Sequence, residues 1–213
     1  VLREEWDAGF LFYGMQTYAK ANVKDVFKKY GASKKGVLFS GLVSSGKAWK
    51  QYYTRRSGIA APHNVDANVA AMSELVPASH EAPNHAFLFT DELPTAGEAA
   101  EEITINWGAV KYNSRFTYDA DSGTYLVSEY GQPYVDGNTG DQVGVTNVLV
   151  LKTRCSAISG DDKGRITVDL TSGGTGYFAC GGKAVEIRWS KAGRDRPLRY
   201  TDSSGQPITL GAG

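Results

Sequence analysis

Hydrophobic positions recur with a helical period near the start of the chain. Between Asn22 and Tyr30, four apolar side chains fall at the i, i+3, i+4 and i+7 positions, and lysines flank them. The pattern predicts a helix that ends at Gly31. Short apolar runs at residues 8–14 and 37–39 are typical of buried strands, so we expect the first part of the chain to mix strands and helices.

Two further helices are predicted before residue 103. Asn64 is suited to be the N-cap of the first, which would place Asp66 in the positive first turn. The inner face of this helix would carry Val69, Met72, Leu75 and Val76. Thr95 and Glu98 form a capping-box pattern, which indicates a short helix through Glu102.

After residue 102 the pattern changes to the alternation typical of strands. Residues 115–118 and 124–127 predict a hairpin across the turn at 119–123, with Gly123 where a positive φ is required. The continuous apolar run from Asn147 to Thr153 predicts a central strand buried on both faces. Other strands are expected at 103–107, 165–170, 176–179, 184–189, 198–201 and 207–210, with turns at 173–176, 181–182 and 202–205. The predicted fold class is α+β: a mixed α/β segment over 1–102 and an antiparallel β-rich domain over 103–213.

The net charge is zero, but the charged residues are unevenly distributed along the chain. The 213 residues carry no formal net charge, which argues against a general binder of nucleic acid or anionic membrane. Residues 18–56 nevertheless hold ten Lys and Arg against Asp25 alone, whereas residues 66–141 hold thirteen acids and two bases. Either these segments solvate different faces, or a basic face attracts an anionic polymer in a salt-sensitive way.

Neither hydropathy nor the cysteines indicate a membrane span or a disulfide framework. No run approaches the ~18 apolar residues that a spanning helix needs, and the chain begins at Val1 without a signal peptide, as expected of a processed protein or a fragment. Cys155 and Cys180 each end a predicted strand, so they are either a disulfide between antiparallel neighbours or two small buried thiols.

The densest polar chemistry lies between residues 55 and 64. Arg55 and Arg56 offer planar forks for a carboxylate or phosphate, and His63 has a reference pKa suited to proton transfer. With Asn64 they form the candidate ligand-binding set. The structural alternative is that Pro62 directs the chain, His63 fills a corner and Asn64 caps a helix. No complete catalytic constellation accompanies them, so no catalytic residue is assigned.

Other motifs give no metal or cofactor. Acidic turns at 119–123, 136–141 and 161–164 resemble calcium loops but lack the glutamate at the twelfth position, and no Cys/His spacing indicates zinc. We therefore expect no metal ion and no cofactor. A basic and aromatic hairpin from Trp189 to Tyr200 is either a stacking surface for sugars or bases, or a β edge protected by charge.

Seven motifs occur in an order that resembles one family. They are Arg56 through Ala61-Pro62-His63-Asn64, Phe116-x-Tyr118-Asp119-x-x-x-Gly123-x-Tyr125, Asp136-x-x-Thr139-Gly140, Asn147-Val148-Leu149-Val150, Gly174-x-Gly176-Tyr177, Gly182-Lys183 through Ile187-x-Trp189-x-Lys191, and Asp202-x-x-Gly205. Together they resemble the YerB-like family of bacterial lipoproteins, which is built on a domain of unknown function.

The resemblance implies an α/β domain joined to a β-rich C-terminal domain, exported and tethered to the outer face of the membrane, with no established activity. Members of the family carry a further N-terminal stretch with a signal, a lipid-attachment cysteine and the first part of the α/β domain. They also continue past the last strand. We therefore expect the α/β segment of this chain to be incomplete and its contact with the membrane to be a lipid anchor outside the chain.

Two functions follow as hypotheses. The first is an extracytoplasmic, non-enzymatic module that binds a wall polymer, an anionic glycan or an envelope protein through Arg55, Arg56, His63 and Asn64, without specific binding of nucleic acid. The second is an envelope hydrolase or transferase that uses His63 as general base and Arg56 to stabilise an anion. The sequence indicates no oligomeric state.

Overall fold

The computed structural model divides the chain into two compact units. It describes residues 10–12, 17–18, 21–22, 25, 28–29, 38–40, 50–61, 64–81, 85, 87–94, 96–108, 112–162 and 164–213. The N-terminal unit comprises Val1–Asn84, Ser156–Thr167 and Gly193–Pro197, and the C-terminal unit comprises His85–Cys155, Val168–Ala192 and Leu198–Gly213. The domain boundary expected at residue 102 stays a prediction.

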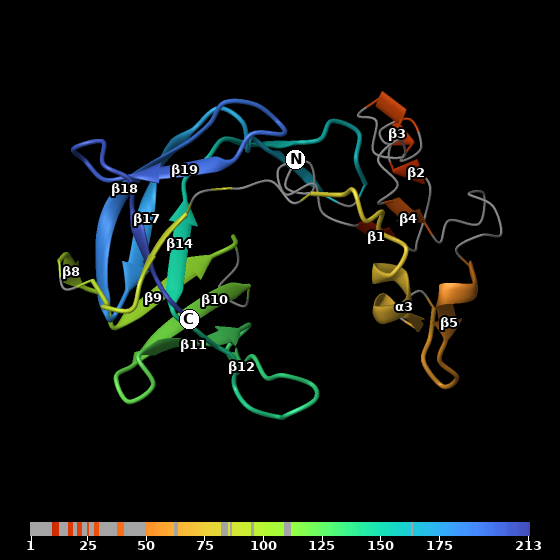
Figure 1. Cartoon of the computed structure of the whole chain (residues 1–213), viewed down its shortest axis with the longest axis horizontal. Coiled ribbons are helices and arrows are strands. Elements are labelled where there is room, and N and C mark those ends of the chain that lie inside the picture. Colours follow the sequence, from red (N-terminus) through yellow and green to blue (C-terminus); the bar gives the residue numbers. More distant parts are fainter. Residues whose placement is uncertain are drawn as a thin grey trace. The chain divides into compact units, whose positions relative to one another are not determined.

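Short elements make up the N-terminal unit (Figure 1). Its strands β1 (Phe10–Phe12) and β4 (Leu38–Ser40) pair in parallel, and β2 (Thr17–Tyr18) pairs with β3 (Ala21–Asn22). The 3₁₀ turn η2 (Lys50–Tyr52) leads into β5 (Tyr53–Arg55), which forms an antiparallel hairpin with β6 (Val65–Ala67). Helix α3 spans Val69–Ser73. Strands β15 (Cys155–Ala157) and β16 (Ile166–Val168), which belong to this unit except for Cys155 and Val168, pair with each other.

Asn64 is not the helix cap that the sequence suggested. Val65–Ala67 form a strand, and the N-cap of α3 is Asn68, whose side-chain oxygen accepts from the Ala71 backbone N at 3.0 Å. Both asparagines carry the same local signal. The pairing of Val65 with Arg55 across the hairpin commits the intervening residues to a strand, because β-branched Val65 suits a pleated partner.

The helix expected through Glu102 is also wrong. Glu98–Ala99 form strand β8, which pairs with Lys183 and Ala184, and strand β9 already begins at Glu102. The Ala100 backbone N donates to the Gly182 carbonyl at 2.8 Å, so pairing with a distant strand overrides the capping signal.

At Asn22 the chain is in strand β3, although Asp25, Lys28 and Lys29 are helical; the rest of the helix expected over 22–30, and its stop at Gly31, lie outside the described residues. The described structure is therefore mostly antiparallel β with little helix. This corrects the expected α+β balance.

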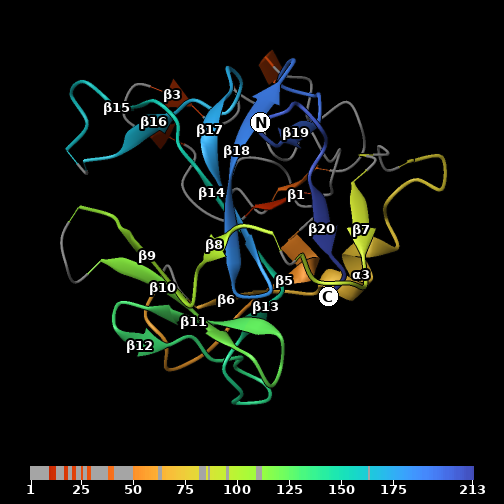
Figure 2. The ribbon, with the colours of Figure 1, turned by 90° about the vertical axis from the view of Figure 1, so that its left-hand side faces the viewer.

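The first sheet of the C-terminal unit has the strand order β12-β11-β10-β9 (Figure 2). Its strands are β9 (Glu102–Asn106), β10 (Asn113–Asp119), β11 (Thr124–Glu129) and β12 (Gln132–Pro133), and β13 (Gly144–Val145) pairs with β11. The predicted hairpin is confirmed, since Asp119 pairs with Thr124 and Gly123 has a φ of 69°.

The second sheet has the order β14-β17-β18-β19, with β8 added on β18. Its strands are β14 (Asn147–Leu151), β17 (Gly174–Cys180), β18 (Lys183–Lys191) and β19 (Leu198–Thr201). The turn predicted at Gly181-Gly182 is confirmed, and both residues have the positive φ that a two-residue hairpin requires. The turn expected at 173–176 is wrong beyond Gly173, because Gly174 already belongs to β17.

Strand β14 lies at the edge of its sheet rather than at the centre, yet both of its faces are covered. Val148 belongs to the buried cluster of Tyr125 and Ala179, whereas Leu149 packs against the cluster of Phe178, Cys180 and Ile187. The continuous apolar run therefore indicates a strand that is covered on both faces, and not a strand at the centre of its sheet.

The C-terminal strand is held by a parallel pairing and by one amide. Strand β20 (Thr209–Gly211) pairs in parallel with β7 (Leu88–Thr90), which departs from the expected all-antiparallel arrangement. The Asn147 side chain donates to the Gly211 carbonyl and accepts from its N–H, both at 2.8 Å. Both cysteines are free thiols in the structure, Cys155 exposed and Cys180 buried.

Candidate functional site

The β5–β6 hairpin positions three of the four candidate residues. Strand pairing places Arg55 opposite Val65, and the Arg56 backbone N donates to the Asn64 carbonyl at 2.8 Å. The ends of the connecting loop are thus fixed by backbone hydrogen bonds. Arg55, Arg56 and Asn64 come together there, whereas His63 and Pro62 lie outside the described residues.

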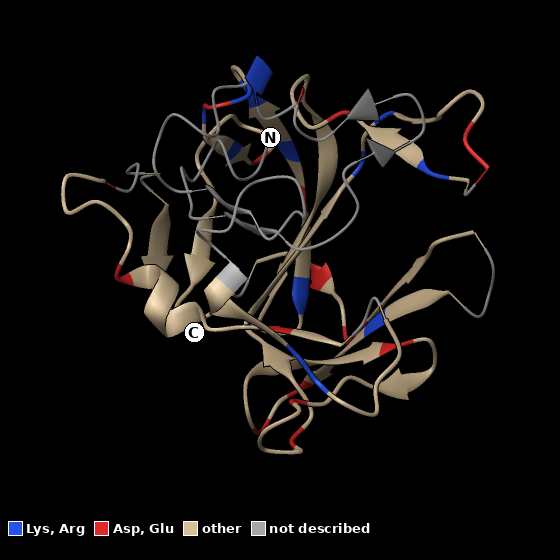
Figure 3. Cartoon of the chain, turned by 90° about the vertical axis from the view of Figure 1, so that its right-hand side faces the viewer, with Lys and Arg blue, Asp and Glu red and all other residues tan. Residues whose placement is uncertain are grey.

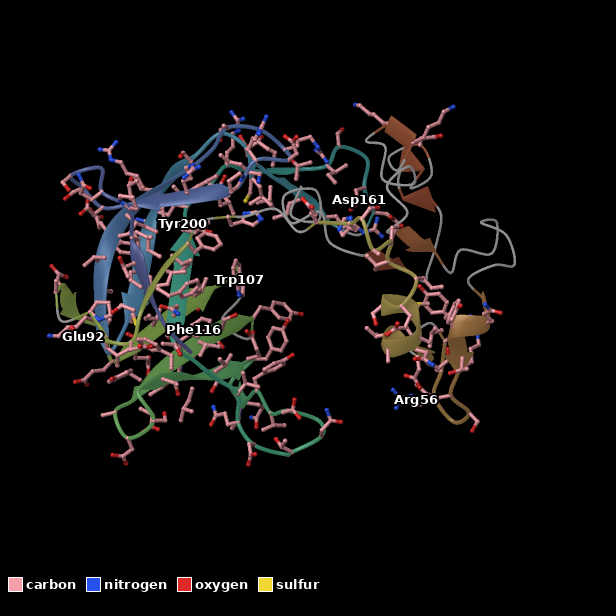
Figure 4. All side chains as sticks on the ribbon, viewed as in Figure 1. Arg56, Glu92, Trp107, Phe116, Asp161 and Tyr200 are labelled. Carbon is pink, nitrogen blue, oxygen red and sulfur yellow. The ribbon has the colours of Figure 1, made fainter. Side chains whose placement is uncertain are left out.

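Side-chain contacts hold both guanidinium groups at the surface. Arg55 Nη1 donates to Asn64 Oδ1 at 2.6 Å, and Asn64 Nδ2 donates to the Arg56 carbonyl at 3.4 Å. Arg56 Nε lies 2.9 Å from Asp66 Oδ2, and the Arg56 side chain remains 61% exposed. Figure 4 shows Arg56 on this hairpin of the N-terminal unit.

This arrangement suits recognition of an anion better than proton transfer. A guanidinium has five N–H donors, and the ion pair with Asp66 uses Nε of Arg56, while its Nη groups make no hydrogen bond with the described residues. Proton transfer by His63 would need a carboxylate to orient the imidazole. Asp66, three residues further along the chain, is bound to Arg56 instead.

The aspartates of the acidic turns accept hydrogen bonds from residues of their own turns. Asp136 Oδ1 accepts from the backbone N of Thr139 and Asn138, which lowers the pKa of its carboxyl. The Ser122 hydrogen bonds lower the pKa of Asp119 in the same way. Asp161 accepts from the backbone and side chain of Arg165. Among the described residues, no three His, Cys, Asp or Glu side chains form a group that could hold a metal ion.

A surface that the sequence interpretation missed lies at one end of the β9–β12 sheet. Trp107, Tyr112, Tyr130 and Tyr134 are all exposed there. The Trp189 hairpin, by contrast, is no stacking surface, because Trp189 is 2% exposed and donates from Nε1 to the Lys152 carbonyl. The usable signal was position: these aromatic residues stand at strand ends and turns, whereas Phe116 and Tyr118, inside β10, are partly buried.

In the part of the chain that the structure describes, every helix is too short or too polar to cross a bilayer.

Comparisons with known proteins place the chain in a family and confirm the resemblance. Residues 103–213 match the model of the C-terminal domain of a protein of unknown function, DUF3048. The crystal structure of the YerB protein from Bacillus subtilis matches with a TM-score of 0.71 and 20% sequence identity. The match covers 99% of this chain and 66% of that protein, so the chain spans about two thirds of its length. At this identity the likeness shows the fold alone. No curated protein matches the chain.

Proposed function

This chain belongs to the DUF3048 family of proteins of unknown function, and we propose that it is a non-enzymatic binding module of the bacterial cell envelope. Its ligand is an anionic wall polymer, and its contact set is Arg55, Arg56, His63 and Asn64. The observation that carries the proposal is the exposed arginine pair on the β5–β6 hairpin, held by Asn64 and Asp66.

The chemistry of the pair fits repeated negative charges. Arginine forks match phosphate and carboxylate in two-point hydrogen bonds, and anchoring by Asn64 reduces the side-chain freedom lost on binding. Asp66 offsets part of the positive charge, so attraction to a single anion would be weak. A polymer that presents many anions compensates through repeated contacts.

The proposed location is extracytoplasmic, with the module tethered by a lipid anchor outside this chain. The YerB-like resemblance is its support. Protease treatment of intact cells that express the full-length protein tests it: we expect the C-terminal unit to be digested from outside, and protection until lysis would contradict this location.

The experiment on function measures co-sedimentation of the purified chain with cell-wall fragments in 0.05 M and 1 M salt. Arg56→Ala should weaken binding about fivefold in low salt, since one charged hydrogen-bonding group is lost. Asp66→Asn should strengthen binding, because it removes the competing carboxylate. High salt should abolish binding, as the Debye length falls to about 3 Å at 1 M.

The matched control is Arg188→Ala, which removes one exposed positive charge from β18 in the other unit. Equal losses from Arg56→Ala and Arg188→Ala would show attraction to net charge rather than to the hairpin. Binding that persists in 1 M salt would also contradict the proposal.

A hydrolase or transferase remains the second hypothesis, without a contact that favours it. Release of soluble fragments from the wall material by the chain, abolished in His63→Ala, would replace the binding proposal with this one.

A further inference from the structure

The aromatic surface of the C-terminal unit is held in place by hydrogen bonds rather than by burial. Trp107 is 64% exposed, yet its Nε1 donates to Ser114 Oγ at 2.9 Å. Ser114 is buried and donates in turn to Glu129 Oε2 at 3.0 Å. This chain of bonds fixes the indole with its ring in solvent (Figure 4). A preorganised ring loses little entropy when a ligand covers it.

Tyr130 occupies a conformation that its side chain disfavours. Glu129 pairs with Gln132, and the two residues between them, Tyr130 and Gly131, have φ angles of 54° and 77°. Such a turn normally takes Asn or Gly, because a left-handed conformation costs other residues about 1–2 kcal/mol. Burial does not offset this cost, since Tyr130 is 65% exposed. An exposed, strained aromatic residue is a feature that function can explain.

Contacts connect the four aromatic residues. Those of Tyr112 and Tyr130 meet edge to face with their centroids 5.9 Å apart. Tyr130 and Tyr134 line the same groove together with Glu129, Val127 and Pro133. Trp107 joins this surface through the Ser114–Glu129 bonds and through its backbone N, which donates to the Tyr112 carbonyl at 2.9 Å.

Polar groups on this surface accept hydrogen bonds. Glu129 Oε1 has no hydrogen bond with the described residues, and Glu129 lines the groove together with Tyr130 and Tyr134. The charged residues described in segments 105–108, 112–114 and 127–143 are Glu129, Asp136 and Asp141, without a Lys or Arg. Figure 3 shows the acidic residues on the loops of this sheet. Arg115, the next residue of β10, has its Nη1 3.8 Å from Glu102 Oε2, so the charges around this surface favour an uncharged ligand over an anionic one.

We propose that Trp107, Tyr112, Tyr130 and Tyr134 form a binding surface for an uncharged oligosaccharide, with Glu129 as its hydrogen-bond acceptor. Sugar rings present C–H faces that complement the negative face of an aromatic ring, and hydroxyl groups that donate to a carboxylate. A proline-rich peptide would also suit aromatic rings, but the Trp107 indole cannot donate to its carbonyl groups, because Nε1 is already bound to Ser114. This surface belongs to the other unit from the arginine hairpin, and the proposal does not rest on the proposed function of that hairpin.

The test is isothermal titration of the full chain with two uncharged probes, the hexamer of β-1,4-linked N-acetylglucosamine and cellohexaose. We expect at least one to bind. Trp107→Ala and Tyr130→Ala should each weaken binding about tenfold, since a stacked ring contributes ~1–3 kcal/mol. Trp107→Phe keeps a ring and should lose less. Glu129→Gln should weaken binding several-fold by replacing the carboxylate acceptor.

Two variants separate binding from folding. Tyr130→Asn removes the ring but suits the left-handed turn, so it should raise the urea midpoint while weakening sugar binding about tenfold, as Tyr130→Ala does. Tyr177→Ala is the matched control: it removes another exposed tyrosine, on β17, whose ring lies under Lys152. This control should bind as tightly as the unmodified chain.

The proposal is wrong if neither sugar binds at ~5 mM, a concentration that detects affinities of about 4 kcal/mol. Equal weakening by Tyr177→Ala would overturn it, as would binding of a hexaproline peptide in place of both sugars. The effect of salt on binding distinguishes this surface from the arginine hairpin. Sugar binding should persist in 1 M salt and in Arg56→Ala, so either site can fail alone.

Discussion

At the scale of single residues, the family motifs in the C-terminal unit mark close contacts within the fold. A Cβ on Gly176 would lie 2.4 Å from the Val150 carbonyl oxygen of the neighbouring strand. A Cβ on Gly174 would meet the Lys152 carbonyl at 2.5 Å and the Trp189 ring at 2.8 Å. These glycines therefore allow β14, β17 and the buried Trp189 to approach one another closely.

Substitution of Gly176 tests this role. Gly176→Ala should lower the free energy of unfolding of the C-terminal unit by about 2 kcal/mol, because a backbone carbonyl cannot move aside cheaply. Urea unfolding followed by tryptophan fluorescence measures it. Gly137→Ala is the matched control, since a Cβ at Gly137 meets no atom within 4 Å. Equal midpoints for the two variants would contradict the close contact.

At the scale of elements, strand pairing determined the secondary structure where the local sequence pattern did not. Glu98–Ala99 carry a helix-start pattern and yet form a strand, because β18 supplies its backbone partners. The Asn147 side chain likewise replaces a missing strand partner, by pairing with both backbone groups of Gly211. It thereby links the edge of one sheet to the β7–β20 pair.

Loss of the Asn147 amide should loosen the C-terminal strand. Asn147→Ala leaves a part-buried N–H and C=O of Gly211 unpaired, which costs about 1–3 kcal/mol. Hydrogen exchange should show faster exchange at the Gly211 amide, with smaller changes in β10 and β11. Asn138→Ala, in an exposed loop, should leave the Gly211 amide protected. Unchanged protection in Asn147→Ala would show that β7 holds the strand alone.

At the scale of the whole molecule, aspartates that accept hydrogen bonds within their own turns make the free energy of unfolding depend on pH. The backbone N of Thr171 and the hydroxyl of Ser172 donate to Asp169 and lower its pKa to about 2. Hydrogen bonds from Ser204 and Gln206 lower the pKa of Asp202 as well. Because these carboxyls bind protons less readily when folded, they stabilise the fold above their unfolded pKa near 4.

Acid should therefore destabilise the C-terminal unit between about pH 4 and pH 2. The urea midpoint should fall across this range, and Asp169→Asn should lower it at pH 7 while making the acid decline shallower. The control is Asp121→Asn, since the Asp121 carboxylate makes no hydrogen bond with the described residues. A decline of unchanged steepness in Asp169→Asn would show that other groups control the acid response.

The sequence by itself determined the β-rich C-terminal domain and the family. Alternation at residues 115–127 and paired glycines at 181–182 fix strands and tight turns through local backbone geometry, which needs no distant partner. Arg55, Arg56 and Asn64 were grouped in the prediction as near neighbours in sequence, but the hairpin that pairs them was not predicted, since a helix was expected after Asn64.

Tertiary structure alone decided the rest. Which strand pairs with which depends on contacts between residues far apart in the chain, so the edge position of β14, the parallel β7–β20 pair and the strand at Glu98 carry no local signal. Exposure follows from the same packing. Trp189 and Trp107 both lie at or near strand ends, yet their exposure differs. Packing buries Trp189, whose Nε1 donates to the Lys152 carbonyl, whereas Trp107 stays in solvent with its Nε1 bound to Ser114.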